Sequence, residues 1–112
     1  MEKELVMYAR TAFCPDVARA VRFLDSKNVP YRRIDIDQDQ AAAERVEGWV
    51  GHCSVPTLVI APAGELEPIE APAPLAPGRN ARSVDRGTMI TEPSEDALSR
   101  FLERHGLIGA TA

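Results

Sequence analysis

Cysteine is scarce in this sequence, which contains only Cys14 and Cys53, far apart in the chain. Two such cysteines do not provide the dense disulfide framework of small secreted domains. No apolar run approaches the ~20 residues of a membrane-spanning helix, and the N-terminus lacks the apolar stretch of a signal peptide. We therefore expect a cytoplasmic protein with no membrane partner. In that reducing compartment, a cysteine at a special position is more often catalytic or ligating than structural.

An excess of positive charge is also missing. The 112 residues carry a formal net charge of −4, whereas nucleic-acid binding requires a basic face. No nucleic-acid partner is therefore expected. Aromatic residues make up only 5% of the chain, yet the hydrophobic content of 45% is ordinary for a globular protein. The length predicts a single domain, residues 1–112, that buries a core without cross-links.

Apolar runs and helical spacing alternate along the chain and predict seven elements. Strands are expected at residues 5–8, 31–37, 55–61 and 87–91. Helices are expected at residues 15–28 and 40–50, and from an N-cap at Ser94 to about His105. The order is β-α-β-α-β-β-α. The initial βαβ unit requires its two strands to be parallel, and the last two strands can add an antiparallel edge.

Residues 61–86 differ from the rest of the chain in composition. They hold five prolines and many alanines and show no periodicity. This composition predicts a long, mobile surface loop inserted at about residues 61–86. The sequence itself assigns no role to this insertion.

Cys14 and Pro15 stand between the first strand and the first helix. Proline is favoured at the first helical position, because it loses no hydrogen bond there. Pro15 is expected to take that position, which makes Cys14 the N-cap residue. Its sulfur would lie beside unpaired N–H groups and the positive end of the helix dipole, an environment that favours a thiolate. Arg10, in the same loop, adds a positive charge. Because the thiolate is the nucleophile in disulfide exchange, Cys14 is a candidate catalytic residue; the alternative is a buried, unreactive cysteine.

The chain resembles the glutaredoxin-like proteins of the thioredoxin fold. Three features carry the resemblance: the Cys14-Pro15 pair, the Val55-Pro56 pair before a strand, and the order of the elements. It covers residues 3–61 well and residues 87–108 loosely. It implies an α/β, thioredoxin-like (glutaredoxin-type) fold with a four-stranded mixed sheet and helices on both faces. It also implies a cis peptide before Pro56, which holds the Val55 backbone open toward the cysteine for an extended peptide or glutathione.

The active-site tetrad departs from the family pattern. Dithiol members carry Cys-Pro-Tyr-Cys, but this chain has Cys14-Pro15-Asp16-Val17. Val17 cannot form the local disulfide, so the tetrad is limited to monothiol chemistry. Members that carry iron–sulfur clusters have Cys-Gly-Phe-Ser, a pattern that Pro15 and Asp16 do not match. No metal site and no tightly bound cofactor are therefore predicted.

Glutathione remains an open question as a co-substrate. The family places a cation three residues before the cysteine, whereas Arg10 lies four before it. Glutathione binders carry a glycine pair before the last helix, where this chain has Glu92 and Pro93. Glu92 would repel the carboxylates of glutathione, whereas Ser94 and the helix N-terminus offer N–H groups to an anion.

The sequence allows two interpretations for Asp16 and two for Cys53. Asp16 either stabilises the first turn of its helix or opposes ionisation of Cys14 and shuttles protons, and the structural reading is favoured. Cys53 lies three residues before Pro56. It is either a small hydrophobe in a loop, the favoured reading, or a resolving thiol that attacks a mixed disulfide on Cys14, which requires Cα atoms within ~7 Å.

These observations predict a thiol–disulfide oxidoreductase that acts through Cys14 on protein or glutathione mixed disulfides. The alternative is a non-catalytic thioredoxin-fold module that binds a peptide or thiol at the Val55–Pro56 edge. An iron–sulfur cluster carrier is a weaker third reading. The expected partner is a disulfide-containing protein or a small thiol, and the sequence does not set the oligomeric state.

Overall fold

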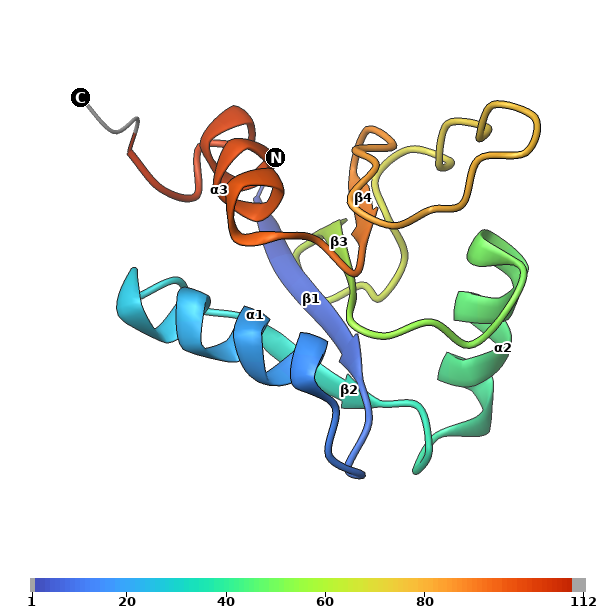
Figure 1. Ribbon diagram of the computed structural model, residues 1–112. Coiled ribbons are helices and arrows are strands. Elements are labelled where there is room, and N and C mark those ends of the chain that lie inside the picture. The colour runs from blue at the N-terminus through green and yellow to red at the C-terminus, as the bar shows by residue number, and fades with distance from the viewer. Residues whose placement is uncertain (1, 110–112) are drawn as a thin grey trace.

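The elements of the computed structural model, which describes residues 2–109, follow the predicted order (Figure 1). The strands are β1 (Lys3–Ala9), β2 (Arg32–Asp35), β3 (Thr57–Pro62) and β4 (Met89–Thr91). The helices are α1 (Pro15–Ser26), α2 (Gln40–Val50) and α3 (Glu95–Arg104). Among the described residues, none of the helices combines the length and apolar character that crossing a membrane requires.

The four strands form one mixed sheet in the order β2-β1-β3-β4. β1 runs parallel to β2, whereas β3 is antiparallel to both β1 and β4. The predicted thioredoxin-like topology is therefore confirmed. Because β1 and β2 are adjacent and parallel, the loops that follow them meet at one edge of the sheet, where the start of α1 also lies.

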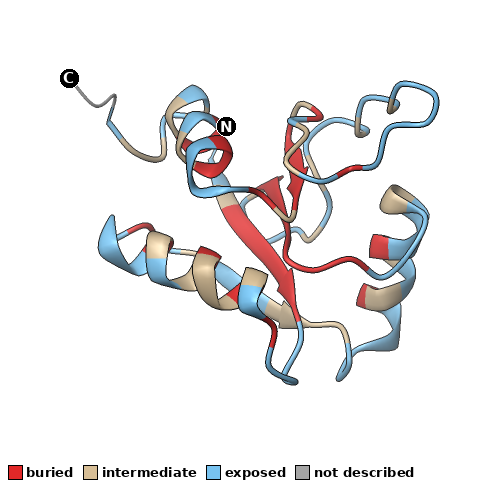
Figure 2. Cartoon of the chain, viewed as in Figure 1, coloured by how far each residue is buried: buried red, intermediate tan, exposed pale blue. Residues whose placement is uncertain are grey.

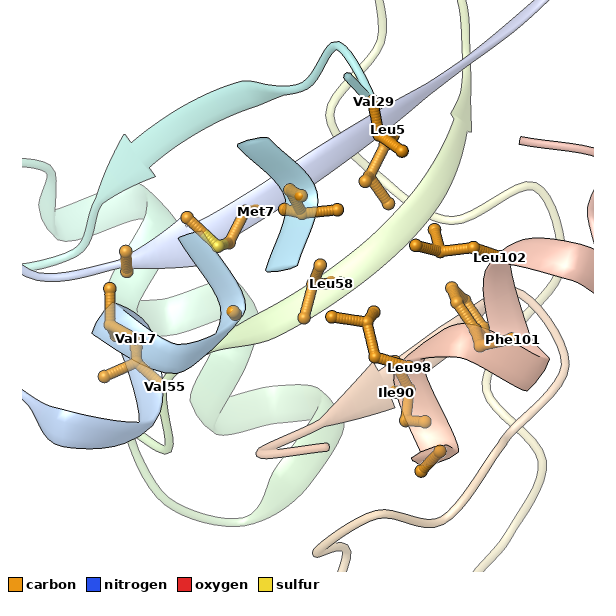
Figure 3. Packing of buried hydrophobic residues seen from close by; sticks show 14 of the residues in the cluster. Leu5, Met7, Val17, Val29, Val55, Leu58, Ile90, Leu98, Phe101 and Leu102 are labelled. Atoms are coloured by element: carbon orange, nitrogen blue, oxygen red, sulfur yellow. The ribbon is translucent and has the colours of Figure 1, made fainter. Parts of the chain in front are cut away.

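The helices cover both faces of the sheet, as predicted. Alternate side chains of β1 point to opposite faces, so that Leu5 and Met7 join one buried cluster and Val6 and Tyr8 join the other. The first cluster includes residues of α1 and α3, and Figure 3 shows Leu98 and Phe101 of α3 in it. The second is covered by α2. Burial is concentrated in the sheet and on the inner faces of the helices (Figure 2).

Local sequence signals account for most of the helix boundaries. Asp39 caps α2 by accepting a hydrogen bond from the Ala42 N–H at 3.1 Å. Gly51 ends α2 with the left-handed φ of 98° that glycine adopts readily. α1 ends two residues before the predicted boundary, because Asn28 adopts a left-handed φ of 54° that no helix continues.

The segment between β3 and β4 is held to the domain at several points. Near its start, the Ile69 N–H donates to the Ile60 carbonyl at 2.9 Å. Near its end, the buried Arg86 donates to the carbonyls of Ala73 and Trp49 at 2.7 and 2.8 Å, and burial lowers its pKa. The insertion is thus bound both to the sheet and to α2.

His105 links the end of α3 to the turn before β4 and gives the fold a pH dependence. Its Nε2 lies 2.8 Å from the Gly87 carbonyl, and desolvation lowers the pKa of His105 below its ordinary value. The unfolded chain therefore binds this proton more readily, so stability is full above about pH 6.5 and declines as the pH falls below that value. Urea unfolding at several pH values should show this decline, and His105→Gln should flatten it. Equal slopes for both proteins would contradict the assignment.

Candidate active site

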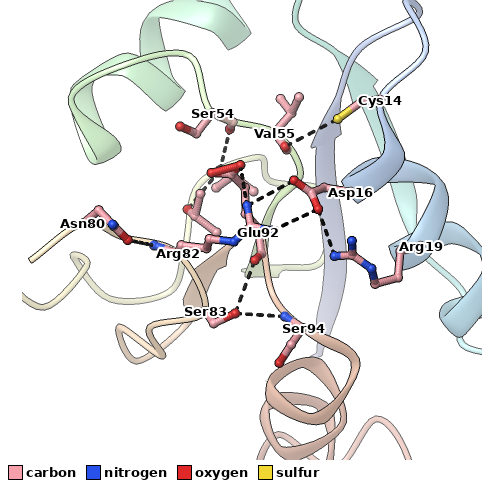
Figure 4. Close-up of polar contacts among 12 residues, drawn as sticks. Cys14, Asp16, Arg19, Ser54, Val55, Asn80, Arg82, Ser83, Glu92 and Ser94 are labelled. Carbon is pink, nitrogen blue, oxygen red and sulfur yellow. Dashed lines mark hydrogen bonds and ion pairs between the residues drawn. The ribbon is translucent and has the colours of Figure 1, made fainter.

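Cys14 lies at the N-cap of α1, as predicted. Its backbone is extended, with φ −142° and ψ 119°, and Pro15 follows at the first helical position. The cysteine is 9% exposed and its side chain makes no capping hydrogen bond. The sulfur lies 4.0 Å from the Val55 carbonyl oxygen, across from the first turn of α1 (Figure 4). Cys14 is therefore beside the positive end of a helix dipole.

Asp37 holds the loop that precedes Cys14. The Thr11 N–H donates to both oxygens of the Asp37 carboxylate at 3.0 Å, and the Thr11 hydroxyl donates at 2.6 Å. The Ala12 N–H adds a longer contact of 3.4 Å. Hydrogen bonding, chiefly from the Thr11 side chain, lowers the pKa of Asp37. Sequence reasoning missed this role, although parallel pairing of the first two strands brings the ends of both to one edge.

The predicted cis peptide between Val55 and Pro56 is present. Thr57 begins β3 directly after it, and the Pro56 carbonyl accepts a hydrogen bond from the Glu92 N–H at 2.7 Å. This bond ties the Val55–Pro56 turn to the end of β4. The Val55 backbone consequently lies opposite Cys14 in a fixed position.

A cleft of about 390 Å³ opens beside Cys14 and brings most of the predicted site residues together. Six of them line it: Arg10, Cys14, Pro15, Asp16, Cys53 and Val55. Ser94 does not belong to this lining. It caps α3 by accepting a hydrogen bond from Ala97 at 3.1 Å, and its own N–H donates to the Ser83 hydroxyl at 2.9 Å.

Cys53 is exposed at the cleft, and its sulfur faces α2. The Sγ atom lies 3.9 Å from both the Ala43 carbonyl oxygen and the Glu47 Oε2. Cys14 and Cys53 are both free thiols in this structure. The two sulfurs thus line one cleft but contact different parts of the chain.

Asp16 belongs to a charge network that spans two distant segments. Arg82 donates to both of its carboxylate oxygens at 3.2 Å, and Arg19 pairs with it at 2.9 Å. Arg82 also donates to Glu92 at 3.1 Å (Figure 4). The hydrogen bonds from Arg82 are the main cause of the lowered pKa of Asp16. The negative charge of Asp16 beside the thiol is therefore balanced by Arg19, three residues along the same helix, and by Arg82, which the sequence did not indicate as a partner.

Arg82 was missed because it lies in the insertion, 66 positions from Asp16. The only signal is a cluster of arginines at positions 79, 82 and 86 in a segment otherwise rich in proline and alanine. The Arg82 backbone forms an isolated parallel bridge with Thr91 at the end of β4. That bridge fixes the guanidinium between the two carboxylates.

Replacing Arg82 with alanine should slow the reaction of Cys14 with a small neutral disulfide by about tenfold at low salt. The change removes the cation that Glu92 pairs with and leaves Asp16 with Arg19 alone, beside an anionic nucleophile. Stopped-flow measurement of thiol consumption tests this, and added salt should reduce the effect. The double variant Asp16→Asn with Arg82→Ala should recover most of the rate. Because the pairs are exposed, stability should change by less than about 1 kcal/mol.

The described residues contain no group of three or more His, Cys, Asp or Glu side chains placed to hold a metal ion. The site that does exist joins a free cysteine at a helix N-terminus to a cis-proline turn on a mixed four-stranded sheet. Together these features define a thioredoxin-fold protein with a free cysteine at its candidate site.

Comparison with known protein families identifies the family within that fold. Residues 5–64 match the glutaredoxin family model, and the chain belongs to the glutaredoxin family. Membership supports a thiol–disulfide oxidoreductase function in general terms. Searches of curated proteins and of solved structures return no significant match.

Proposed function

We propose that the protein catalyses thiol–disulfide exchange through the single thiolate of Cys14. The observation that carries this proposal is the position of the sulfur at the start of α1, without a capping bond and opposite Val55 in an open cleft. A helix N-terminus stabilises the thiolate, and the cleft gives a substrate access to it.

Each turnover consists of two exchange steps. The Cys14 thiolate attacks one sulfur of the substrate disulfide, the substrate S–S bond breaks, and the other sulfur leaves as a thiolate that takes a proton from water. Cys14 and the first substrate sulfur are then joined in a mixed disulfide. A second thiolate attacks that substrate sulfur and expels Cys14 as a thiolate. The second thiol and the first substrate sulfur are then joined in a new disulfide, and the other substrate sulfur has been released as a thiol.

The second thiolate belongs to an external molecule in this proposal. Val17, where dithiol members have their second cysteine, is a buried residue of α1. Cys53 contacts α2 through its sulfur, which favours the external thiol over an internal resolving step. Glutathione is one candidate: Arg10 at the cleft offers a cation for a carboxylate, and the charge of Glu92 is offset by its pair with Arg82. The scheme requires no tightly bound cofactor.

Mass spectrometry of the oxidised protein tests the proposal. After reaction with oxidised glutathione, peptide mapping should find the adduct on Cys14, and the Cys53→Ser variant should form it equally. An adduct on Cys53 alone would contradict the proposal. A disulfide between Cys14 and Cys53 would instead support the internal resolving step.

Turnover distinguishes the enzyme from the non-catalytic binding module. With a glutathione-coupled or dithiol-coupled assay, the enzyme should reduce many equivalents of disulfide per protein. Formation of the Cys14 adduct without turnover under either reductant would support the binding module.

A further inference from the structure

The insertion forms the far wall of the active-site region. Its segment 79–83 is held against the end of β4, where the Ser83 N–H donates to the Thr91 carbonyl at 2.8 Å. The Ser83 hydroxyl accepts the Ser94 N–H at 2.9 Å, and Arg82 pairs with two carboxylates of the site. These contacts hold residues 82 and 83 of the insertion in place beside the active site.

A second cleft of about 190 Å³ continues the active-site cleft toward this wall. Three residues line both clefts: His52, Ser54 and Glu92. Asn80, Ala81 and Arg82 of the insertion line the second cleft. The two clefts share a wall, and together we call them the Asn80 groove, with Cys14 lining the first cleft and Asn80 the second.

Free hydrogen-bonding groups line the Asn80 groove. Ser54 is only 7% exposed, and within the described part of the chain its hydroxyl makes no hydrogen bond. Because this hydroxyl lines the groove and makes no hydrogen bond to the described residues, it is available to a ligand there. The side-chain Oδ1 of Asn80 accepts a hydrogen bond from the Arg82 backbone N–H at 3.0 Å, which leaves the Asn80 side-chain NH₂ available. The His52 ring makes no hydrogen bond with any described residue.

The groove carries little net charge at the Asn80 end. Arg82 lies between Asp16 and Glu92 and neutralises this part of the wall, so the available groups are neutral donors and acceptors. Such a lining suits the neutral N–H and C=O groups of a peptide main chain. A small thiol that carries carboxylates gains no charge pairing from such a lining.

We propose that the Asn80 groove binds the main chain of a polypeptide substrate beside its disulfide, with Ser54 and Asn80 as specificity-determining residues. This inference rests on the proposed function of Cys14 and gives the insertion a role in substrate choice. The substrate class is an extended, neutral protein segment whose cysteine reaches Cys14 at the other end of the groove.

Two probes with one leaving group test the inference. The first is a neutral, terminally blocked heptapeptide whose central cysteine forms a mixed disulfide with thionitrobenzoate. The second is the mixed disulfide of 2-mercaptoethanol with thionitrobenzoate, which has no peptide groups. The Cys14 thiolate attacks the peptide or mercaptoethanol sulfur and expels thionitrobenzoate, whose absorbance reports the rate. All proteins carry Cys53→Ser so that the exposed thiol does not react.

Ser54→Ala and Asn80→Ala should each raise the half-saturating concentration of the peptide probe about tenfold, a loss typical of one hydrogen bond. The saturating rate and the rate with the mercaptoethanol probe should stay unchanged. Arg79→Ala, the matched control on the neighbouring residue outside the groove, should leave both probes unaffected. Equal effects on both probes, or no effect on either, would overturn the inference.

Binding without chemistry separates this inference from the proposed function. The same heptapeptide with serine in place of cysteine should bind the unmodified chain in calorimetry and bind Asn80→Ala about tenfold more weakly. If neither disulfide probe reacts but the serine peptide binds in this pattern, the proposed function fails and the groove assignment stands. If the probes react and the serine peptide does not bind, the groove assignment fails and the function stands.

Discussion

Cys14→Ser should reduce disulfide reduction by about a thousandfold or more, to the rate of the uncatalysed exchange. Serine keeps the size of the side chain and its place at the N-cap of α1, but a hydroxyl is not ionised at neutral pH and forms no disulfide. The measurement is steady-state turnover of a mixed disulfide with saturating reductant. Serine is also a favoured N-cap residue and should not weaken the helix. A loss of this size would therefore come from the missing thiol and not from unfolding.

Cys53→Ser is the matched control for this variant because it removes the other thiol of the same cleft. It should retain nearly the full rate if an external thiol resolves the mixed disulfide. Activity that persists in Cys14→Ser and disappears in Cys53→Ser would exchange the roles of the two cysteines. Thermal melting of both variants establishes that each remains folded.

Phe101→Ala should lower the free energy of unfolding by about 3–5 kcal/mol. The Phe101 ring is fully buried between α3 and the sheet, and it packs at 4.8 Å against His105 in an edge-to-face arrangement. Removing it leaves a cavity in the cluster that attaches α3 to β3 and β4 (Figure 3). Since a domain has only about 5–15 kcal/mol of stability, this single change removes a large part of it. Urea denaturation measures the loss.

Phe13→Ala makes the same chemical change at a position that is 80% exposed. It should alter the free energy of unfolding by no more than about 0.5 kcal/mol, because no buried contact is lost. Similar losses for both variants would show that α3 is not packed as described. The comparison of the two variants also bears on the active site. α3 begins three residues after Glu92, which lines the same cleft as Cys14.

Sequence patterns predicted the fold because its signals are local. The first strand reads as an apolar run, Pro15 marks the first turn of α1, and Ser94 marks the start of α3. Each of these depends on neighbours within a few residues and can therefore be recognised before the tertiary structure is known. The cis bond before Pro56 was predicted by the family resemblance and is present.

The site itself was predicted only in part. Cys14 and Val55 were expected to face each other, and they do. The roles of Asp37 and Arg82 were not predicted, because hydrogen bonding to Thr11 and pairing with Asp16 each join residues that are far apart in the sequence.

The sequence by itself determined the order of strands and helices, the absence of a second cysteine at Val17, and the place of Cys14 at a helix start. Only the tertiary structure decided that the insertion returns to the active site, that Arg82 pairs with Asp16, and that the clefts beside Cys14 and Asn80 share a wall. The physical reason is range: caps and periodicity act between near neighbours, whereas a groove depends on the path of the whole chain.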